Sequence, residues 1–187
     1  MDEAGRGPLA GPLVAAAVSL PRDAYLQGVT DSKKLSDKKR RTLFPEIIRI
    51  AIGYSTGIVE HSEIDEVGMA ESVRLAFYRA AQAIDILDAL YLVDGLPIRN
   101  LDLQSRFIVK GDSKSLSIAA ASIIAKVTRD DIMIKAENEF PGYGFASNKG
   151  YGSREHMKAI EKLGPSPIHR MSFAPLKYEK QIRIHFE

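Results

Sequence analysis

The chain has 187 residues, no cysteine and no tryptophan, and its 26 Lys and Arg nearly balance its 24 Asp and Glu. This composition is typical of a globular protein with one main core, and it excludes disulfides and thiolate metal sites. No run approaches the ~20 apolar residues of a membrane span, and no basic region followed by an apolar run opens the sequence. We therefore expect a cytoplasmic location.

Charge is distributed in blocks along the chain. Residues 31–50 carry seven Lys or Arg against three acids, residues 60–102 carry nine acids against three arginines, and residues 141–187 carry eight basic residues against four acids. Basic blocks around an acidic one are typical of a polyanion-binding rim around an acidic metal centre. Ordinary solvated helix faces give the same pattern.

The first half of the chain contains strand and helix patterns. The apolar run 13–20 predicts a buried strand, and residues 51–59 predict another. Ser36 is a suitable N-cap for a basic helix that runs through Ile50, in which Pro45 should cause a kink or a break. Ser62, followed by three acids within four residues, predicts the start of a helix that runs to about residue 83.

The second half alternates strands and helices. Apolar segments at 89–93 and 107–109 predict two strands, and Ser117 is expected to cap a long alanine-rich helix over 118–137. A Gly-rich loop over 141–152 precedes a helix over 153–163, and a last helix is expected near Pro175. This order of elements predicts an α/β domain with a mixed sheet.

Four acids follow or adjoin the predicted strands. Asp94 and Asp112 are each the first acid beyond an apolar strand, so parallel strands would bring them to one sheet edge. Asp2 and Glu3 stand near the start of a possible third element. Four such carboxylates would repel one another unless cations bind between them, and oxygen ligands without His or Cys suit Mg²⁺ or Mn²⁺. Because magnesium usually takes its remaining ligands from substrate phosphates, a magnesium site here indicates phosphoryl-transfer chemistry.

Each acid also has a purely structural interpretation. Asp94-Gly95 is a common turn, and Asp112 could cap a turn. Asp2 and Glu3 are consecutive, so a regular strand would point them to opposite faces. Glu3 must then lie at a strand end or bend, or serve a second ion.

Several loop residues are suited to contact nucleic acid. Gly5, Arg6 and Gly7 would let backbone amides and a guanidinium approach a sugar or phosphate. Ser32 and Lys33 fit phosphate contacts, or could be polar caps. Tyr151, between two glycines, could stack on a sugar or base. His156, His169 and His185 lack metal-like spacing and are interpreted as surface or hydrogen-bonding residues.

Five ordered blocks carry a resemblance to a known family. DEAGRGPLAGP, TDSKKLS, LVDG, KGDSKSLSIAAASIIAKVTRD and KGYG…GPSPIHR resemble, in that order, the type 2 ribonucleases H (ribonuclease HII), from Asp2 to about Phe173. Type 3 relatives usually have lysine within the Gly-x-Gly, so Arg6 favours type 2. Family members normally have several apolar residues before the acid pair, whereas only Met1 precedes Asp2 here. How Asp2 and Glu3 are held in place is thus a structural question.

The resemblance implies a fold and an activity. The fold would be a ribonuclease H-like mixed five-stranded sheet flanked by helices over residues 1–140, with a C-terminal loop and helical extension over 141–187 packed on it. The activity would be endonucleolytic cleavage of RNA paired with DNA, including single ribonucleotides embedded in duplex DNA, by two-metal-ion hydrolysis with Mg²⁺ or Mn²⁺. The protein would act in ribonucleotide removal and DNA replication or repair, and we expect a monomer.

The resemblance also implies roles for individual residues. Asp2, Glu3, Asp94 and Asp112 are similar to the four metal-binding catalytic acids. Gly5, Arg6 and Gly7 resemble the motif that reads the 2′-hydroxyl at the RNA–DNA junction, and Tyr151 the tyrosine that stacks on the following deoxyribose. Ser32 and Lys33 resemble phosphate contacts. Two alternatives stay open at this point: a nuclease of related fold with another substrate, such as a junction resolvase, and a hybrid-binding module without catalysis.

Overall fold

The computed structural model describes residues 1–29 and 32–177, without the side chain of Lys33. Three strands, β1 (Asp2–Ala4), β2 (Leu13–Ser19) and β3 (Gly53–Val59), form an antiparallel sheet in that order. Strands β4 (Tyr91–Asp94) and β5 (Ser105–Ile108) form a parallel pair.

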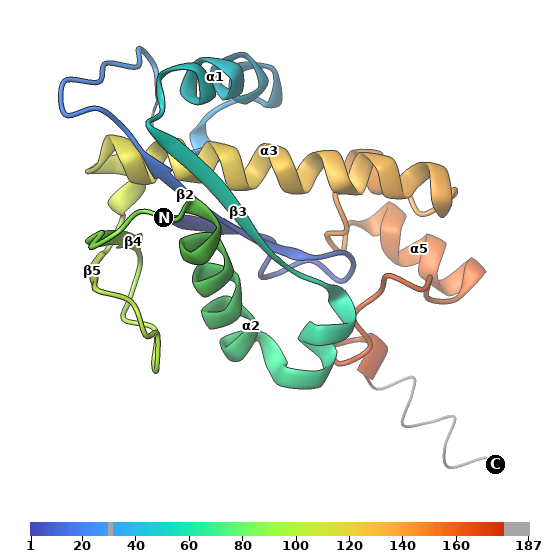
Figure 1. The fold of residues 1–187 in the computed structure, drawn as a ribbon. Coiled ribbons are helices and arrows are strands. Elements are labelled where there is room, and N and C mark those ends of the chain that lie inside the picture. The colour runs from blue at the N-terminus through green and yellow to red at the C-terminus, as the bar shows by residue number, and fades with distance from the viewer. Residues whose placement is uncertain (30–31, 178–187) are drawn as a thin grey trace.

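Met1 joins the two sheets. Its terminal ammonium donates to the carbonyl of Leu92 over 2.6 Å, and its carbonyl accepts from the N–H of Asp94 over 3.0 Å. Asp2 pairs with Ala16 of β2 on the other side. The strands described therefore run in the order β3-β2-β1-β4-β5, and β1 lies in the middle (Figure 1). This arrangement agrees with the α/β class and mixed strand directions expected from the sequence.

Helices cover both faces of the sheet. They are α1 (Asp37–Ile50), α2 (His61–Ile84), α3 (Leu116–Glu139), α4 (Phe145–Asn148) and α5 (Arg154–Leu163), with short 3₁₀ turns η1 (Ser32–Lys34) and η2 (Gly111–Ser113). Figure 1 shows α2 on one side of the sheet and α1 and α3 on the other.

The side chains of β2 explain this layering. Successive strand residues point to opposite faces. Leu13, Ala15 and Ala17 are buried in the cluster formed with α2, whereas Ala16 and Val18 are buried in the cluster formed with α1 and α3. Because both faces of β2 are apolar, the strand reads in sequence as a continuous hydrophobic run rather than an alternating one.

Two predicted helix starts are wrong and one is confirmed. The Ser36 hydroxyl accepts from the N–H of Lys39 over 3.2 Å, as expected of an N-cap, and α1 continues through Pro45 without a break. The N-cap of α2 is Glu60 rather than Ser62, because Glu60 and Glu63 form a reciprocal capping box. The N-cap of α3 is Ser115 rather than Ser117. In both cases the serine chosen from sequence lies inside the first turn.

The C-terminal part packs beside the sheet through a third apolar cluster. Phe145 and Ile160, from α4 and α5, are buried there against Leu9, Ala10 and Met133. A single antiparallel bridge pairs Ala10 with His169. The helix expected near Pro175 reaches the limit of the described residues, and His185 lies outside them.

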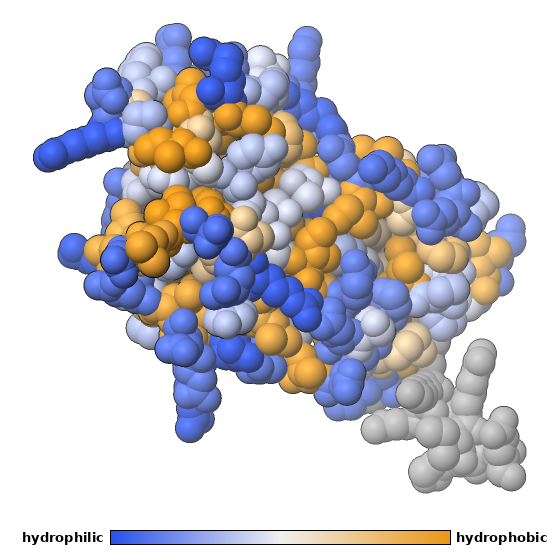
Figure 2. All heavy atoms as spheres, in the orientation of Figure 1, coloured by the Kyte–Doolittle hydropathy of each residue, from blue (hydrophilic) through white to orange (hydrophobic). Residues whose placement is uncertain are grey.

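On the face drawn in Figure 2, hydrophobic residues come to the surface mainly at the left, between α1 and β4, and in a band across the centre. Within the part of the chain that the structure describes, a membrane-crossing helix is absent, because none is both long and apolar enough.

Candidate active site

The acid pair lies on the central strand β1. Asp2 is 7% exposed, and its Oδ1 accepts the N–H of Glu3 over 2.7 Å. The Ser122 hydroxyl of α3 also hydrogen-bonds the Asp2 carboxylate. Since β1 is held by β2 on one side and by β4 on the other, Asp2 is fixed although it is the second residue. The acid pair is thus held in place by the strands on both sides of β1.

Asp94 and Asp112 are linked by the backbone between them. Asp94 ends β4, and its Oδ1 accepts the N–H of Gly111 over 2.6 Å. Gly111 begins the turn η2, in which Asp112 is the next residue. A Cβ at Gly111 would meet Ile118 Cδ1 at 2.6 Å and Asp94 Oδ1 at 3.3 Å. The close approach of Asp94 to the turn therefore depends on the glycine.

Two of the other acids influence Asp2. Burial, together with the negative charges of Glu3 and Asp94, raises the pKa of Asp2 to about 7, against the effect of the hydrogen bonds to the carboxylate. A carboxylate placed this way is stabilised by a cation. Oxygen donors without His or Cys fit a hard divalent ion. As the side chains are placed, however, no three acids or histidines among the described residues are already arranged to hold one.

A cleft of about 640 Å³ adjoins these acids. Glu3, Arg6 and Asp94 line it together with residues of α2 and of the loop that follows β4: Val67, Ala70, Glu71, Val73, Phe77, Gly95, Leu96, Pro97, Ile98, Arg99 and Asn100. The cleft thus joins two of the four acids to the Gly-Arg-Gly segment in one surface opening.

The Gly-Arg-Gly segment turns directly beside the acids. Arg6 is exposed, and its Nη1 lies 3.2 Å from Glu3 Oε1. Gly5 has φ of 101° and is buried, and a Cβ there would lie 2.2 Å from Arg129 Nε. A residue with a side chain could adopt neither this conformation nor this contact without strain. A Cβ at Gly7 would lie 3.9 Å from Tyr151 Cε1, so the segment also borders Tyr151.

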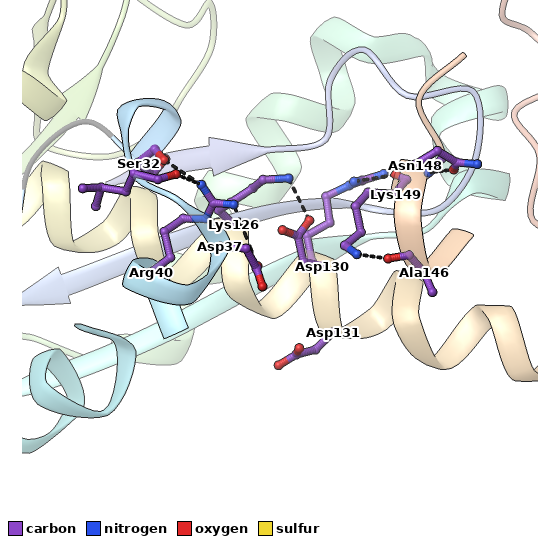
Figure 3. A network of polar contacts seen from close by, with 12 residues as sticks. Ser32, Asp37, Arg40, Lys126, Asp130, Asp131, Ala146, Asn148 and Lys149 are labelled. Atoms are coloured by element: carbon purple, nitrogen blue, oxygen red, sulfur yellow. Dashed lines mark hydrogen bonds and ion pairs between the residues drawn. The ribbon is translucent and has the colours of Figure 1, made fainter. Parts of the chain in front are cut away.

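Tyr151 projects from the loop between α4 and α5. It is 45% exposed, and two cations of α3 lie near its ring: Lys126 Nζ at 5.8 Å and Arg129 Cζ at 5.9 Å from the centroid. Figure 3 shows Lys126 extended along α3 to Asp130, with an Nζ–Oδ1 distance of 2.7 Å, and Lys149 near the start of this loop. An exposed aromatic ring beside cations is a suitable platform for a sugar with its phosphate.

The two residues of η1 predicted to contact phosphate differ in what the structure shows. Ser32 is 4% exposed, and its Oγ lies 2.5 Å from Ser122 Oγ, so its hydroxyl faces the interior and α3 rather than the surface. Through Ser122 it connects with Asp2. The Lys33 side chain lies outside the described part, and its phosphate contact stays a prediction.

Sequence reasoning missed the two buried arginines that support the site, and of its two interpretations of His156 and His169 the hydrogen-bonding one is confirmed. Arg129 and Arg170 are fully buried and donate to backbone carbonyls of the loop that contains Gly5. His156 and His169 are buried as well, with their Nε2 atoms 3.1 Å apart. His156 Nδ1 hydrogen-bonds the Tyr151 carbonyl over 2.8 Å. The one sequence signal for Arg170 and His169 was their place in the GPSPIHR block.

Comparison with known proteins points to one family. A family model described as Ribonuclease HII matches residues 1–176. A protein named Ribonuclease HII from Lachnoclostridium phytofermentans is 50% identical over 173 residues, which are 92% of this chain and 68% of that relative. The crystal structure of ribonuclease H2 from Pyrococcus horikoshii superposes with a TM-score of 0.80 at 31% identity, covering 97% of this chain and 96% of that one.

A second solved structure agrees. It is that of the PCNA:RNase HII complex from Archaeoglobus fulgidus, with a TM-score of 0.75 at 28% identity over 91% of this chain and 90% of that one. The resemblance seen in the five sequence blocks is therefore confirmed by sequence and by structure. The chain belongs to the ribonuclease HII family of endonucleases.

Proposed function

We propose that this protein cleaves the RNA strand of RNA–DNA hybrids, and single ribonucleotides embedded in duplex DNA, by hydrolysis at a site with two divalent ions. Membership of the ribonuclease HII family supports the reaction. The observation that carries the site is the electrostatic coupling of Asp2 with Glu3 and Asp94 beside a cleft that Arg6 also lines.

Asp2, Glu3, Asp94 and Asp112 are the proposed metal ligands. Mg²⁺ or Mn²⁺ bound by them would lower the pKa of a water nucleophile and stabilise the leaving oxygen, giving 5′-phosphate and 3′-hydroxyl ends. The protein positions the donors. The Glu3 N–H and the Ser122 hydroxyl orient Asp2, and the Gly111 N–H orients Asp94.

Other residues would bind the nucleic acid. Exposed backbone at Arg6 and Gly7 lies where a ribose could approach closely, and Tyr151 borders Gly7 with its ring half exposed. Lys33, and Ser32 through its backbone, would contact phosphates. Since such contacts neutralise phosphates without reading bases, binding should weaken as salt rises and depend little on sequence.

The proposed setting follows from this chemistry. An enzyme that cuts at ribonucleotides in DNA would act in their removal during DNA replication and repair, and we propose a cytoplasmic location for it. We propose that the protein acts as a monomer.

The test is cleavage of a labelled duplex that carries one ribonucleotide, with Mg²⁺ and separately with Mn²⁺, followed by mapping of the cut ends. We expect a cut at the ribonucleotide with a 5′-phosphate on the downstream piece. A parallel panel of all-DNA, all-RNA, hybrid and four-way-junction substrates should show no cleavage outside ribonucleotide-containing DNA and hybrids. Cleavage of the junction would favour a resolvase, and salt-dependent binding without metal-dependent products would favour a binding module.

A further inference from the structure

Two fully buried arginines lie behind the Gly-Arg-Gly segment. Arg129 is on α3 and Arg170 follows α5, and both are 0% exposed. Within residues 1–29 and 32–177, neither guanidinium forms an ion pair with a carboxylate. Burial lowers the pKa of both guanidinium groups, that of Arg170 to about 9 with a contribution from the charge of Arg129. Arginine side chains stay protonated in proteins. Buried charges of this kind are costly unless they are hydrogen-bonded.

Their hydrogen-bond partners are backbone carbonyls, and all but one of these belong to the loop between β1 and β2. Arg170 donates Nη2 to Gly5 O over 2.7 Å, Nη1 to Arg6 O over 3.2 Å and Nε to Gly11 O over 2.9 Å. The Arg170 side chain therefore holds both the Gly-Arg-Gly turn and Gly11, which lies near the end of the same loop.

Arg129 holds the far end of the loop in the same way. It donates Nε to Pro12 O over 2.9 Å, Nη2 to Ala10 O over 3.1 Å and Nη1 to Lys149 O over 3.0 Å. Lys149 is two residues before Tyr151, so Arg129 ties the Gly-Arg-Gly loop to the loop of the aromatic residue. Neither contact depends on side chains of the loops themselves.

The Arg170 hydrogen bonds determine which way the amides face. In a trans peptide, the carbonyl of one residue and the N–H of the next point to opposite sides. Because the Gly5 and Arg6 carbonyls point inward to Arg170, the N–H groups of Arg6 and Gly7 point away from the core. Arg6 and Gly7 are exposed, whereas Gly5 is buried. Arg170 thus presents two consecutive N–H donors at the surface beside Glu3.

The attachment of Arg170 is itself supported. Its N–H donates to Leu9 O over 2.8 Å, and the next residue, Met171, donates its N–H to Asp65 Oδ2 of α2 over 2.7 Å. The Arg170 backbone is therefore fixed to α2 and to the loop that its guanidinium orients.

We propose that Arg170 is a positioning residue for ribonucleotide recognition: by holding the Gly5 and Arg6 carbonyls, it aims the Arg6 and Gly7 N–H groups at the sugar and so determines the preference for ribose over deoxyribose. Arg129 has the supporting role of fixing the far end of the loop and linking it to Tyr151. This inference rests on the proposed function, since it assumes that a ribonucleotide binds at the Gly-Arg-Gly segment.

The experiment compares Arg170→Lys with the wild type in equilibrium binding, with Ca²⁺ in place of a catalytic ion, to one duplex that carries a single ribonucleotide and to its all-deoxy counterpart. Lysine keeps the positive charge but cannot hold three separated carbonyls. We expect binding of the all-deoxy duplex to change less than about threefold. The ribo-to-deoxy affinity ratio should fall about tenfold, which corresponds to the loss of one neutral hydrogen bond from the Arg6 or Gly7 N–H to the ribose. Arg79→Lys is the matched control, since Arg79 binds Glu63 and the Ile58 carbonyl away from the site.

A folded Arg170→Lys variant that keeps the wild-type ratio would overturn the proposal. If the variant does not fold, the wild type supplies the test: the amide resonances of Arg6 and Gly7 should shift more with the ribonucleotide duplex than with the all-deoxy duplex, and equal shifts would overturn it. A wild type that neither discriminates between the duplexes nor cleaves would contradict the proposed function instead. The two failures are thereby distinguishable.

Discussion

Gly111 donates its N–H to Asp94 Oδ1 over 2.6 Å, and this hydrogen bond joins the end of β4 to the turn that carries Asp112. Two acids that are 18 positions apart in sequence thereby belong to one rigid unit. The unit meets β1 through the Asp94 N–H, which donates to Met1 O. The geometry of the acid cluster is thus set by backbone groups as well as by the acids themselves.

Gly111→Ala should damage this unit. The added Cβ would meet the buried Ile118 side chain at 2.6 Å and crowd Asp94 Oδ1 at 3.3 Å. We expect a loss of about 1–3 kcal/mol in the free energy of unfolding, as is typical of overpacking, together with a lower cleavage rate. Urea unfolding and single-turnover cleavage measure the two effects. Adding Ile118→Val to Gly111→Ala should restore stability. A Gly111→Ala variant with wild-type stability and rate would show that the close approach of Gly111 to Ile118 and Asp94 is unimportant.

Divalent ions should stabilise the protein more at high pH than at low pH. The pKa of Asp2 in the folded state is raised to about 7 by burial and by Glu3, so the unfolded state binds fewer protons between about pH 4 and pH 7. Without metal, this group therefore lowers stability as pH rises through that range. The increase in melting temperature on adding Mn²⁺ should be larger at pH 8 than at pH 5.5. Asp2→Asn should reduce that difference, and an equal increase at both pH values in the wild type would contradict the assignment.

Ser122→Ala should weaken ion binding without greatly changing the fold. The Ser122 hydroxyl lowers the pKa of Asp2 by hydrogen-bonding its carboxylate, and its removal also leaves Ser32 without the 2.5 Å contact. We expect Mn²⁺ affinity, measured by calorimetry at pH 7, to fall about threefold to tenfold, the range of one typical net hydrogen bond. Ser122→Thr retains the hydroxyl and is the control. Unchanged affinity in the alanine variant would show that Ser122 does not orient Asp2.

The buried histidine pair predicts acid sensitivity. The Ser166 N–H donates to His169 Nδ1 over 2.8 Å, so His169 carries its proton on Nε2 and donates it to His156 Nε2; His156 Nδ1–H then donates to Tyr151 O. Both rings are neutral in this arrangement. Burial lowers the pKa of His169 to about 4, with a contribution from His156.

Because the unfolded state binds the His169 proton near pH 6.5, stability from this residue is complete above that pH and is lost as pH falls toward 4. We expect His169→Gln to flatten the decline of unfolding free energy between pH 7 and pH 5, by up to about 1.4 kcal/mol per pH unit. Tyr143→Phe, which changes a neighbour of both rings without removing a histidine, should keep the wild-type slope. Parallel pH profiles for wild type and His169→Gln would count against the neutral pair.

The sequence predicted the layers of the fold because they depend on local patterns. The apolar run of β2, the Ser36 cap of α1 and the strand-ending Asp94 are all visible within a few residues. The caps of α2 and α3 were misplaced because several polar residues near each start can serve. Glu60 is the N-cap of α2 since its capping box with Glu63 satisfies two backbone donors at once.

The supporting residues of the site could not be found in this way. Nothing local marks Arg170 for burial, because its partners are carbonyls of Gly5, Arg6 and Gly11, more than 150 positions away. The same holds for His156 and His169, whose neutrality depends on each other and on Ser166. Sequence patterns identify residue types suited to chemistry, whereas long-range backbone contacts determine which residues hold them in place.

The most direct test of the acid cluster is single-turnover cleavage of a duplex with one ribonucleotide by Asp94→Asn, beside Asp102→Asn as a matched control outside the cluster. We expect Asp94→Asn to keep its fold but lose at least about a hundredfold in rate in Mg²⁺ and Mn²⁺, because a charged ligand contributes several kcal/mol. Asp102→Asn should cleave at the wild-type rate. A folded Asp94→Asn variant that cleaves at the same rate as the control would contradict the proposed site.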